Sequence, residues 1–142
     1  MSALSVQHVE TGYWVGSAAL SNMGFHVPTC SAETEVVPLV FVPCPELDHL
    51  CNGRAYRVQS TQVGLDRADF WMNAQDVAIP SIIYRAQSPN NQLAYVFDMV
   101  PLGAESFALR SLVDSGWVTV CGPRLVTQPT RTKAAELKFY SF

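Results

Sequence analysis

Glycine, proline and asparagine interrupt this chain so often that no long regular segment is expected. The longest nearly uninterrupted apolar run, residues 36–44, has nine residues and contains both Pro38 and Pro43. A membrane-crossing helix needs about 20 apolar residues, so we expect no such span and no membrane partner. Short apolar segments bounded by turn residues instead predict many short strands.

The chain nevertheless carries enough apolar material for a core. Of its 142 residues, 49% are hydrophobic and 11% aromatic, which excludes a disordered protein. This length is usual for a single domain. Four cysteines are too few for a disulfide scaffold, so we expect thiols, with Cys121 a small buried hydrophobe in the strand 117–121.

The clearest local pattern is a hairpin. The apolar segments 81–86 and 92–100 flank a polar stretch in which Pro89 presets a turn, and Asn90 or Asn91 can adopt a left-handed backbone. These segments are expected to lie in the core as paired strands. Further strands are predicted within 4–15, 36–42, 54–63, 117–121, 124–127 and 137–142.

A helix is predicted over residues 104–115, because Glu105 stands near its start and Gly116 just beyond its end. Its core candidates are Phe107, Leu109, Leu112 and Val113. A single helical turn is predicted over 44–51, with Pro45 at its first position. Residues 16–34 lack a clear period and predict a loop with at most one short strand. Residues 65–76 fit either a short helix or an irregular strand.

These patterns predict a mainly β protein, an antiparallel sandwich or barrel-like single domain with one short helix at about 104–115. We expect residues 1–128 to form the β-rich domain and residues 129–142 a C-terminal linker and arm. No internal repeat is visible in the sequence.

Charge is scarce and unevenly placed. Charged residues make up 15% of the chain, against about 25% in an ordinary soluble domain. A poorly charged surface favours coverage by other subunits. Residues 122–142 carry a net charge of +3 and the whole chain −3, so residues 1–121 carry −6. Four cations in that last stretch are too few to indicate a nucleic-acid partner.

The C-terminal arm is therefore the predicted interaction element. Its alternating pattern suits strand addition to an acidic neighbour of the same kind. The alternative is that this segment closes the sheet of its own domain. The proposed contact residues are Arg131, Lys133, Lys138, Leu137, Phe139, Tyr140 and Phe142.

Cys44, His49 and Cys51, with Cys30 as a fourth candidate, form the one metal-like group in the sequence. Zinc sites usually pair cysteines two to four residues apart, and this spacing differs. The alternatives to a zinc site are a disulfide between Cys44 and Cys51, or cysteines that remain ordinary thiols. We expect ordinary thiols, no metal and no cofactor.

No catalytic motif stands out. Cys44 or Cys121 could in principle pair with His8, His26 or His49, but no nucleophile elbow, zinc-protease motif or phosphate-binding loop is present. Asp66 and Asp69 could form a carboxylate pair or contact a calcium ion, but such a run is more often a solvated turn in which Arg67 neutralises its neighbours. A set of aromatic residues could instead form a ligand platform, although most such residues pack in cores. They are Tyr13, Trp14, Phe70, Trp71, Tyr84, Tyr95, Phe97 and Trp117.

The sequence therefore favours a non-enzymatic structural or assembly protein. We expect a virion-type coat, decoration or tail subunit that contacts copies of itself or another structural protein, as a homo-oligomer. A ligand-binding module using exposed aromatics is the alternative, and a small Cys/His-dependent enzyme ranks third. The first ten residues lack a secretory signal, so synthesis in the cytoplasm and incorporation into a virion are the expected course.

Overall fold

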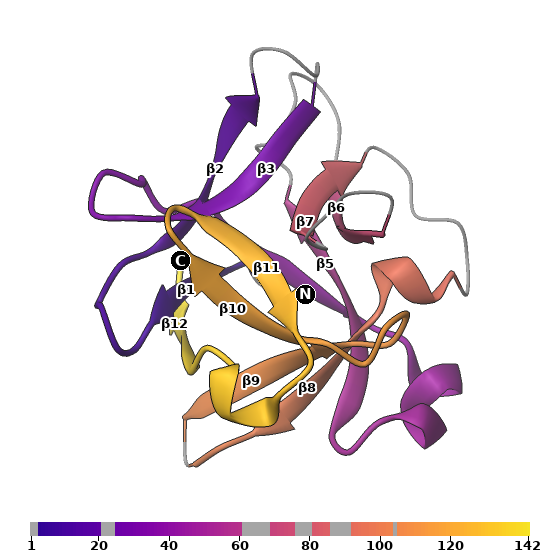
Figure 1. Cartoon of the computed structure of the whole chain (residues 1–142). Helices are drawn as coiled ribbons and strands as arrows, with labels where there is room; N and C mark the ends of the chain where they lie inside the picture. Colours follow the sequence, from indigo (N-terminus) through magenta and orange to yellow (C-terminus); the bar gives the residue numbers. More distant parts are fainter. Residues whose placement is uncertain (1–2, 21–24, 61–68, 76–80, 86–91, 104) are drawn as a thin grey trace.

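The computed structural model describes residues 3–20, 25–60, 69–75, 81–85, 92–103 and 105–142. Within them lie twelve strands, joined in antiparallel pairs, and three short 3-10 helices. The mainly β, barrel-like prediction is confirmed (Figure 1). None of the helices among the described residues has the length and apolar character to cross a membrane.

Six of the described strands close into a barrel. Around the ring, β1 pairs with β12, β12 with β9, β9 with β8, β8 with β5 and β5 with β4. Leu4 and Leu39 close the circle, because each donates its N–H to the other's carbonyl at 2.8 and 2.9 Å. The barrel strands are β1 (Leu4–His8), β4 (Val40–Pro43), β5 (Arg54–Ser60), β8 (Phe97–Pro101), β9 (Ser106–Ser111) and β12 (Leu137–Ser141).

Three hairpins gather beside the barrel. β11 pairs with both β3 and β7, and β3 lies beside β7, so the hairpins meet one another. They are β2 (Val15–Leu20) with β3 (Phe25–Cys30), β6 (Asp69–Ala74) with β7 (Ser81–Arg85), and β10 (Trp117–Cys121) with β11 (Arg124–Gln128). Each hairpin stands between two barrel strands along the chain. The same four-strand unit thus occurs three times, which is the β-trefoil arrangement.

The core draws on all three units. Val6, Val15 and Leu39 come from the first unit and are at most 1% exposed. The second unit adds large aromatic side chains, and the third adds leucines, all in one buried cluster. These side chains are Trp71, Tyr84, Phe97, Leu109, Leu125 and Leu137. A single shared core explains why no unit needs a separate hydrophobic centre.

The helix predicted over 104–115 is wrong, because residues 106–111 form the strand β9. Phe107 and Leu109 point into the main core, while Ala108 packs with Val100 and Trp117 in a second cluster. Apolar residues on both faces of a strand imitate helical spacing. The chain then turns at Asp114, whose Oδ1 accepts the N–H of Gly116 at 2.7 Å.

The predicted hairpin of 81–86 with 92–100 is also wrong. β7 pairs with β6 and β11, whereas β8 pairs with β5 and β9. Residues 93–95 form the 3-10 helix η2 (Leu93–Tyr95) rather than strand. Both strands do contribute buried side chains, as expected. The turn residues 86–91 lie outside the described part of the chain.

Residues 16–34, predicted as a loop, hold most of the β2–β3 hairpin. Pro28 lies within β3, which pairs along its length only with β2 and meets β11 at one position. Proline is tolerated in a strand with such an open side. Of residues 65–76, the described part forms β6. Cys121, expected to be buried, is exposed at the end of β10.

Other local predictions are confirmed. The turn over 44–51 is the 3-10 helix η1 (Pro45–Leu50), with proline at its start. The predicted strands 117–121 and 124–127 correspond to β10 and β11, and the described part of the predicted strand 54–63 is β5, with residues 61–63 outside the described chain. The segment predicted as a linker contains η3 (Arg131–Lys133).

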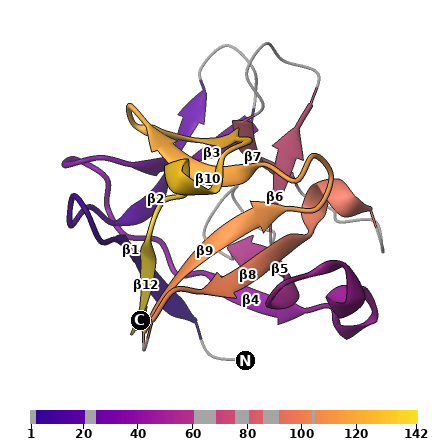
Figure 2. The same cartoon turned by 60° about the horizontal axis from the view of Figure 1, so that its bottom comes forward.

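The last strand belongs to the barrel of its own chain. β12 lies between β1 and β9, with Val6 opposite Phe139 and Phe107 opposite Leu137 (Figure 2). The structure thus has the alternative arrangement, in which residues 137–141 close the domain's own sheet instead of reaching a neighbour's.

Candidate functional site

The most connected polar group in the described residues centres on the carboxylate of Asp98. Asp98 is fully buried on β8, and Arg110 stands directly opposite on β9. The guanidinium donates to Oδ2 through Nε at 3.2 Å and Nη2 at 3.0 Å. The N–H groups of Asn52 and Gly53 also donate to this carboxylate, each at 2.9 Å. We call these four residues the Asp98 network.

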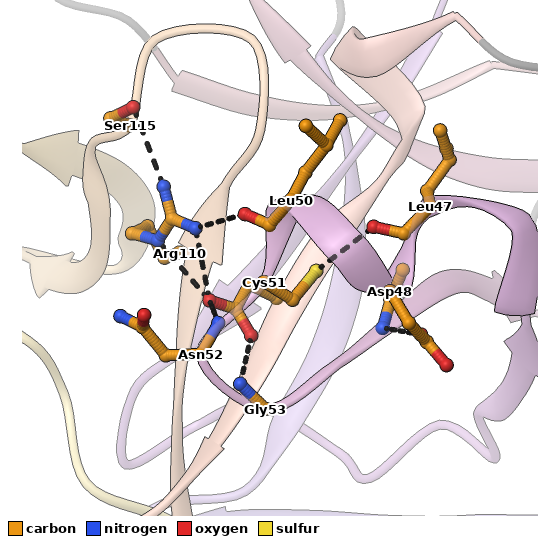
Figure 3. Close-up of polar contacts among 10 residues, drawn as sticks. Leu47, Asp48, Leu50, Cys51, Asn52, Gly53, Arg110 and Ser115 are labelled. Carbon is orange, nitrogen blue, oxygen red and sulfur yellow. Dashed lines mark hydrogen bonds and ion pairs between the residues drawn. The ribbon is translucent and has the colours of Figure 1, made fainter.

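The Asp98 network fastens the loop after η1 to the barrel. Arg110 also donates to the carbonyl of Leu50 at 2.9 Å and reaches the hydroxyl of Ser115 at 3.4 Å (Figure 3). A Cβ on Gly53 would overlap the carbonyl oxygen of Met99, so only glycine allows this approach. Both oxygens of Asp98 are thereby occupied. The group is suited to holding structure, not to chemistry on a substrate.

The cysteines near this network are poor nucleophiles. Cys51 donates its thiol to the carbonyl of Leu47 at 3.6 Å, and burial together with the charge of Asp98 raises its pKa to about 11. Burial also raises the pKa of Cys44, and that of Cys30 to about 11. A thiol acts as a nucleophile or metal ligand only as the thiolate. All four cysteines are free, so Cys44 and Cys51 are not bridged.

The predicted metal-like group is not assembled. His49 is exposed on η1, Cys44 is buried at its start, and Cys30 is buried at the end of β3. No set of three or more histidine, cysteine or acidic residues in the described ranges could hold a metal ion.

The histidines proposed as catalytic partners lie on separate elements, with His8 on β1 and His26 on β3. The Nδ1 of His8 lies 2.8 Å from the hydroxyl of Thr11, and burial lowers the His8 pKa although Glu10 opposes this effect. Asp66 of the candidate carboxylate pair lies outside the described residues, and Asp69 is buried at the start of β6.

Most of the candidate aromatic platform is core. Trp71, Tyr84, Tyr95, Phe97 and Trp117 are all at most 6% exposed. Trp71 packs edge-on against Phe97, with ring centroids 6.1 Å apart. This leaves Tyr13 and Trp14, in the turn between β1 and β2, and the half-buried Phe70.

Trp14 meets an aromatic residue from the other end of the chain. Its ring lies edge-on to Tyr140 with centroids 5.4 Å apart, because β1 and β12 are neighbours and Gln7 of β1 bridges to Trp14. The ammonium of Lys138 lies 5.3 Å from the centre of the Tyr140 ring. We call Trp14, Lys138 and Tyr140 the aromatic surface.

The aromatic surface is partly accessible, since Trp14 and Lys138 are half-buried, and its charge is paired. Tyr140 is 38% exposed, as is Tyr13 in the same turn as Trp14. Lys138 pairs with Glu105 at 3.0 Å, and this hydrogen bond raises the pKa of Lys138. An exposed apolar surface rimmed by a paired charge is typical of a contact site for another molecule.

The other residues predicted for the arm have separate places. Leu137 is fully buried, and Phe139 stacks on Phe107 with centroids 4.2 Å apart. Arg131 lies 5.5 Å from the ring centre of Trp117, and Lys133 is exposed on η3. Phe142 is 59% exposed. The sequence named both Tyr140 and Trp14, but no local signal showed that they meet.

Comparisons with known proteins identify the fold but not a family. No family model and no curated protein matches the chain. The water-soluble chlorophyll protein from Brassica oleracea var. Botrytis, solved with chlorophyll b, has a TM-score of 0.72 at 12% identity, covering 99% of this chain and 91% of that one. A salivary protein from Culex quinquefasciatus, of a cysteine- and tryptophan-rich family, has a TM-score of 0.70 at 7% identity. The match covers 99% of this chain and 93% of that one.

The lysenin pore gives a TM-score of 0.72 at 9% identity, and the match spans all of this chain but 46% of that one. A Caenorhabditis elegans protein of unknown function has a TM-score of 0.66 at 14% identity, and the match covers 99% of this chain and 93% of that one. At such low identities the likeness shows a common fold alone. One of these structures, the water-soluble chlorophyll protein, is a pigment-binding protein.

Proposed function

We propose that this protein is a non-enzymatic binding module that acts through protein–protein contacts at the aromatic surface, its partner being a second copy of this chain. The edge-on contact of Trp14 with Tyr140 on the outside of the barrel carries the proposal. Tryptophan and tyrosine are the residues that most often dominate the energy of protein interfaces. The scarcity of charge, 15% of residues, supports the same proposal.

A protein partner fits this surface better than a stacked sugar or base. Stacking needs an open ring face, but Lys138 lies over the Tyr140 ring and the Trp14 ring packs against it at an interplanar angle of 68°. What is left for a partner is the outer apolar area, to which Val9 and Tyr13 of the same turn add exposed surface. Such area is buried well by a complementary protein surface.

The absence of catalysis is part of the proposal. It is supported by the raised thiol pKa values of Cys30 and Cys51 and by the separation of His8 and His26 on different strands. The pigment-binding protein of the same fold supports the broader idea of a non-catalytic scaffold.

A virion-type assembly role would be one use of self-association. It is supported by the low charge content, whereas none of the solved structures named above is described as a virion protein. Electron microscopy of concentrated protein tests it, since a coat or tail subunit should form rings, tubes or shells.

Sedimentation velocity over a concentration series tests self-association. We expect the sedimentation coefficient to rise with concentration, and the rise to disappear in the double variant Trp14→Ser with Tyr140→Ser. Leu50→Ser is the matched control, because Leu50 is 44% exposed and lies on η1. A wild-type chain that stays monomeric throughout, or a double variant that associates as well as Leu50→Ser, overturns the proposal.

A further inference from the structure

A cavity of about 530 Å³ lies apart from the aromatic surface, between the β2–β3 hairpin, the loop over 31–35 and the turn that joins β10 to β11. The volume is within the range of small-molecule sites, about 300–1,000 Å³. The β10–β11 turn reaches this place because Arg124 pairs with Thr29 and the N–H of Cys30 donates to the carbonyl of Pro123 at 2.8 Å (Figure 1).

Charges of both signs line the cavity without pairing. The exposed residues Glu33 and Glu35 line it from the loop, and Arg124 lines it from β11. The ion pairs between described residues lie elsewhere, at Asp98 with Arg110 and at Lys138 with Glu105. The Nε of Arg124 is shut off from solvent and has no hydrogen-bond partner among the described residues. Since Nε is closed to solvent, a ligand would reach the other nitrogens of the guanidinium of this half-buried residue.

The loop that carries the carboxylates is held in place. The hydroxyl of Thr34 accepts the N–H of Ser31 at 3.1 Å and donates to the hydroxyl of Thr29 at 3.3 Å. A Cβ on Gly16 would overlap the carbonyl oxygen of Glu35, so the loop packs closely on β2. A loop fixed in this way loses little conformational entropy when a ligand binds.

We propose that this cavity binds a small zwitterion of the amino-acid class, with its ammonium group at Glu33 and Glu35 and its carboxylate at Arg124. An ammonium group offers three N–H donors, and a guanidinium binds a carboxylate through two parallel hydrogen bonds. No aromatic ring is among the described residues that line the cavity, so a quaternary ammonium would lack its usual partner. Ala18, Val27 and Pro123 supply apolar surface for the aliphatic part.

The test is an amide chemical-shift titration of the isotope-labelled full chain with each proteinogenic amino acid in turn, up to millimolar concentration. We expect at least one to give saturable shifts at Thr29, Thr34 and Arg124. The matching amine and the matching carboxylic acid should each bind about tenfold more weakly, because each lacks one charge-assisted hydrogen-bonding end. No saturable shift with any amino acid, or equal binding of the amine or acid, overturns the proposal.

Variants separate the two ends of the ligand. Arg124→Gln should weaken binding of the amino acid about tenfold and leave binding of the amine unchanged. The double variant Glu33→Gln with Glu35→Gln should weaken binding of the amino acid but not of the carboxylic acid. Because both glutamates lie on an exposed loop, this variant still tests the proposal if Arg124→Gln does not fold. Lys133→Gln and Glu136→Gln, both exposed and outside the cavity, are the matched controls. Unchanged affinity in the loop variant overturns the assignment.

Discussion

Two ion pairs of the same length occupy very different surroundings. Arg110 meets Asp98 at 3.0 Å, and Lys138 meets Glu105 at 3.0 Å. The side chains of the first pair are 16% and 0% exposed, and those of the second 33% and 71%. The buried carboxylate also accepts two backbone N–H groups. The distance between charges therefore says little about their contribution, and burial with shared hydrogen bonds decides it.

Breaking the buried pair should have the largest effect. Asp98→Ala leaves the guanidinium of Arg110 and the N–H groups of Asn52 and Gly53 without their acceptor. We expect the free energy of unfolding to fall by about 3–5 kcal/mol, the usual result of removing one partner of a buried pair. Urea denaturation measures it. A loss under about 1 kcal/mol would show that water replaces the carboxylate readily.

A second change tests the backbone donors without touching either charge. In Gly53→Ala the new methyl group would overlap the carbonyl of Met99, so the loop must move away from Asp98. We expect a loss of about 2 kcal/mol, within the range for overpacking. Gly103→Ala is the control, since its nearest neighbour would be Ser106 Oγ at 3.7 Å. Equal stability of the two variants would contradict the close approach.

Asp114 is an intermediate case, an exposed carboxylate with several donors. Burial alone would raise its pKa, but hydrogen bonds from the Gly116 N–H and from Asn73, Gln75 and Thr127 outweigh it and lower the pKa below 3.8. The Asp114 carboxyl binds its proton less tightly in the folded chain than in the unfolded one. The ionised carboxylate therefore stabilises the fold above pH 3.8. This stabilisation is lost as the pH falls through the lowered folded value.

Asp114→Asn should therefore flatten the decline in stability in acid and cost about 1 kcal/mol or less near neutral pH. Denaturation midpoints measured from neutral pH down to strong acid give the comparison. If the variant and the parent decline in parallel over this range, the hydrogen bonds to Asp114 do not favour its ionised form.

The exposed pair should have the smallest effect. Lys138→Gln is expected to leave the free energy of unfolding unchanged within error at physiological salt, because both partners are accessible to solvent and screened by ions. Glu105→Gln should behave in the same way. A loss in either variant as large as that of Asp114→Asn would mean that Lys138 stabilises the fold through the Tyr140 ring rather than through Glu105.

Local signals in the sequence were sufficient for elements that depend on local chemistry. Proline at the start of η1 and the apolar run of β10 both predict the observed element. Local patterns fail for elements whose form depends on distant partners. β9 carries apolar residues on both faces because two separate clusters cover it. β7 pairs with β11, which is more than forty residues further along, as the Val126–Ser81 pair shows.

The same limit applies to the candidate surfaces. Lys138 and Tyr140 were identified by their alternating pattern, and Trp14 by its residue type. Their meeting depends on the pairing of β1 with β12, which no local pattern reveals. The sequence does not predict the cavity at Arg124, because its pattern indicates a loop over residues 16–34 and because a turn from the third unit forms one wall of the cavity.

The pairing of β1 with β12 has a consequence for synthesis on the ribosome. Leu4 finds its partner Ser141 only when nearly the whole described chain has been made. At about 5–20 residues per second, synthesis of the stretch between these two residues takes about 7–27 seconds. Until then the early strands have an open edge, and open edges recruit other strands. A nascent chain of this kind is vulnerable to aggregation until β12 emerges, so slow translation of the residues just before β12 would prolong the risk.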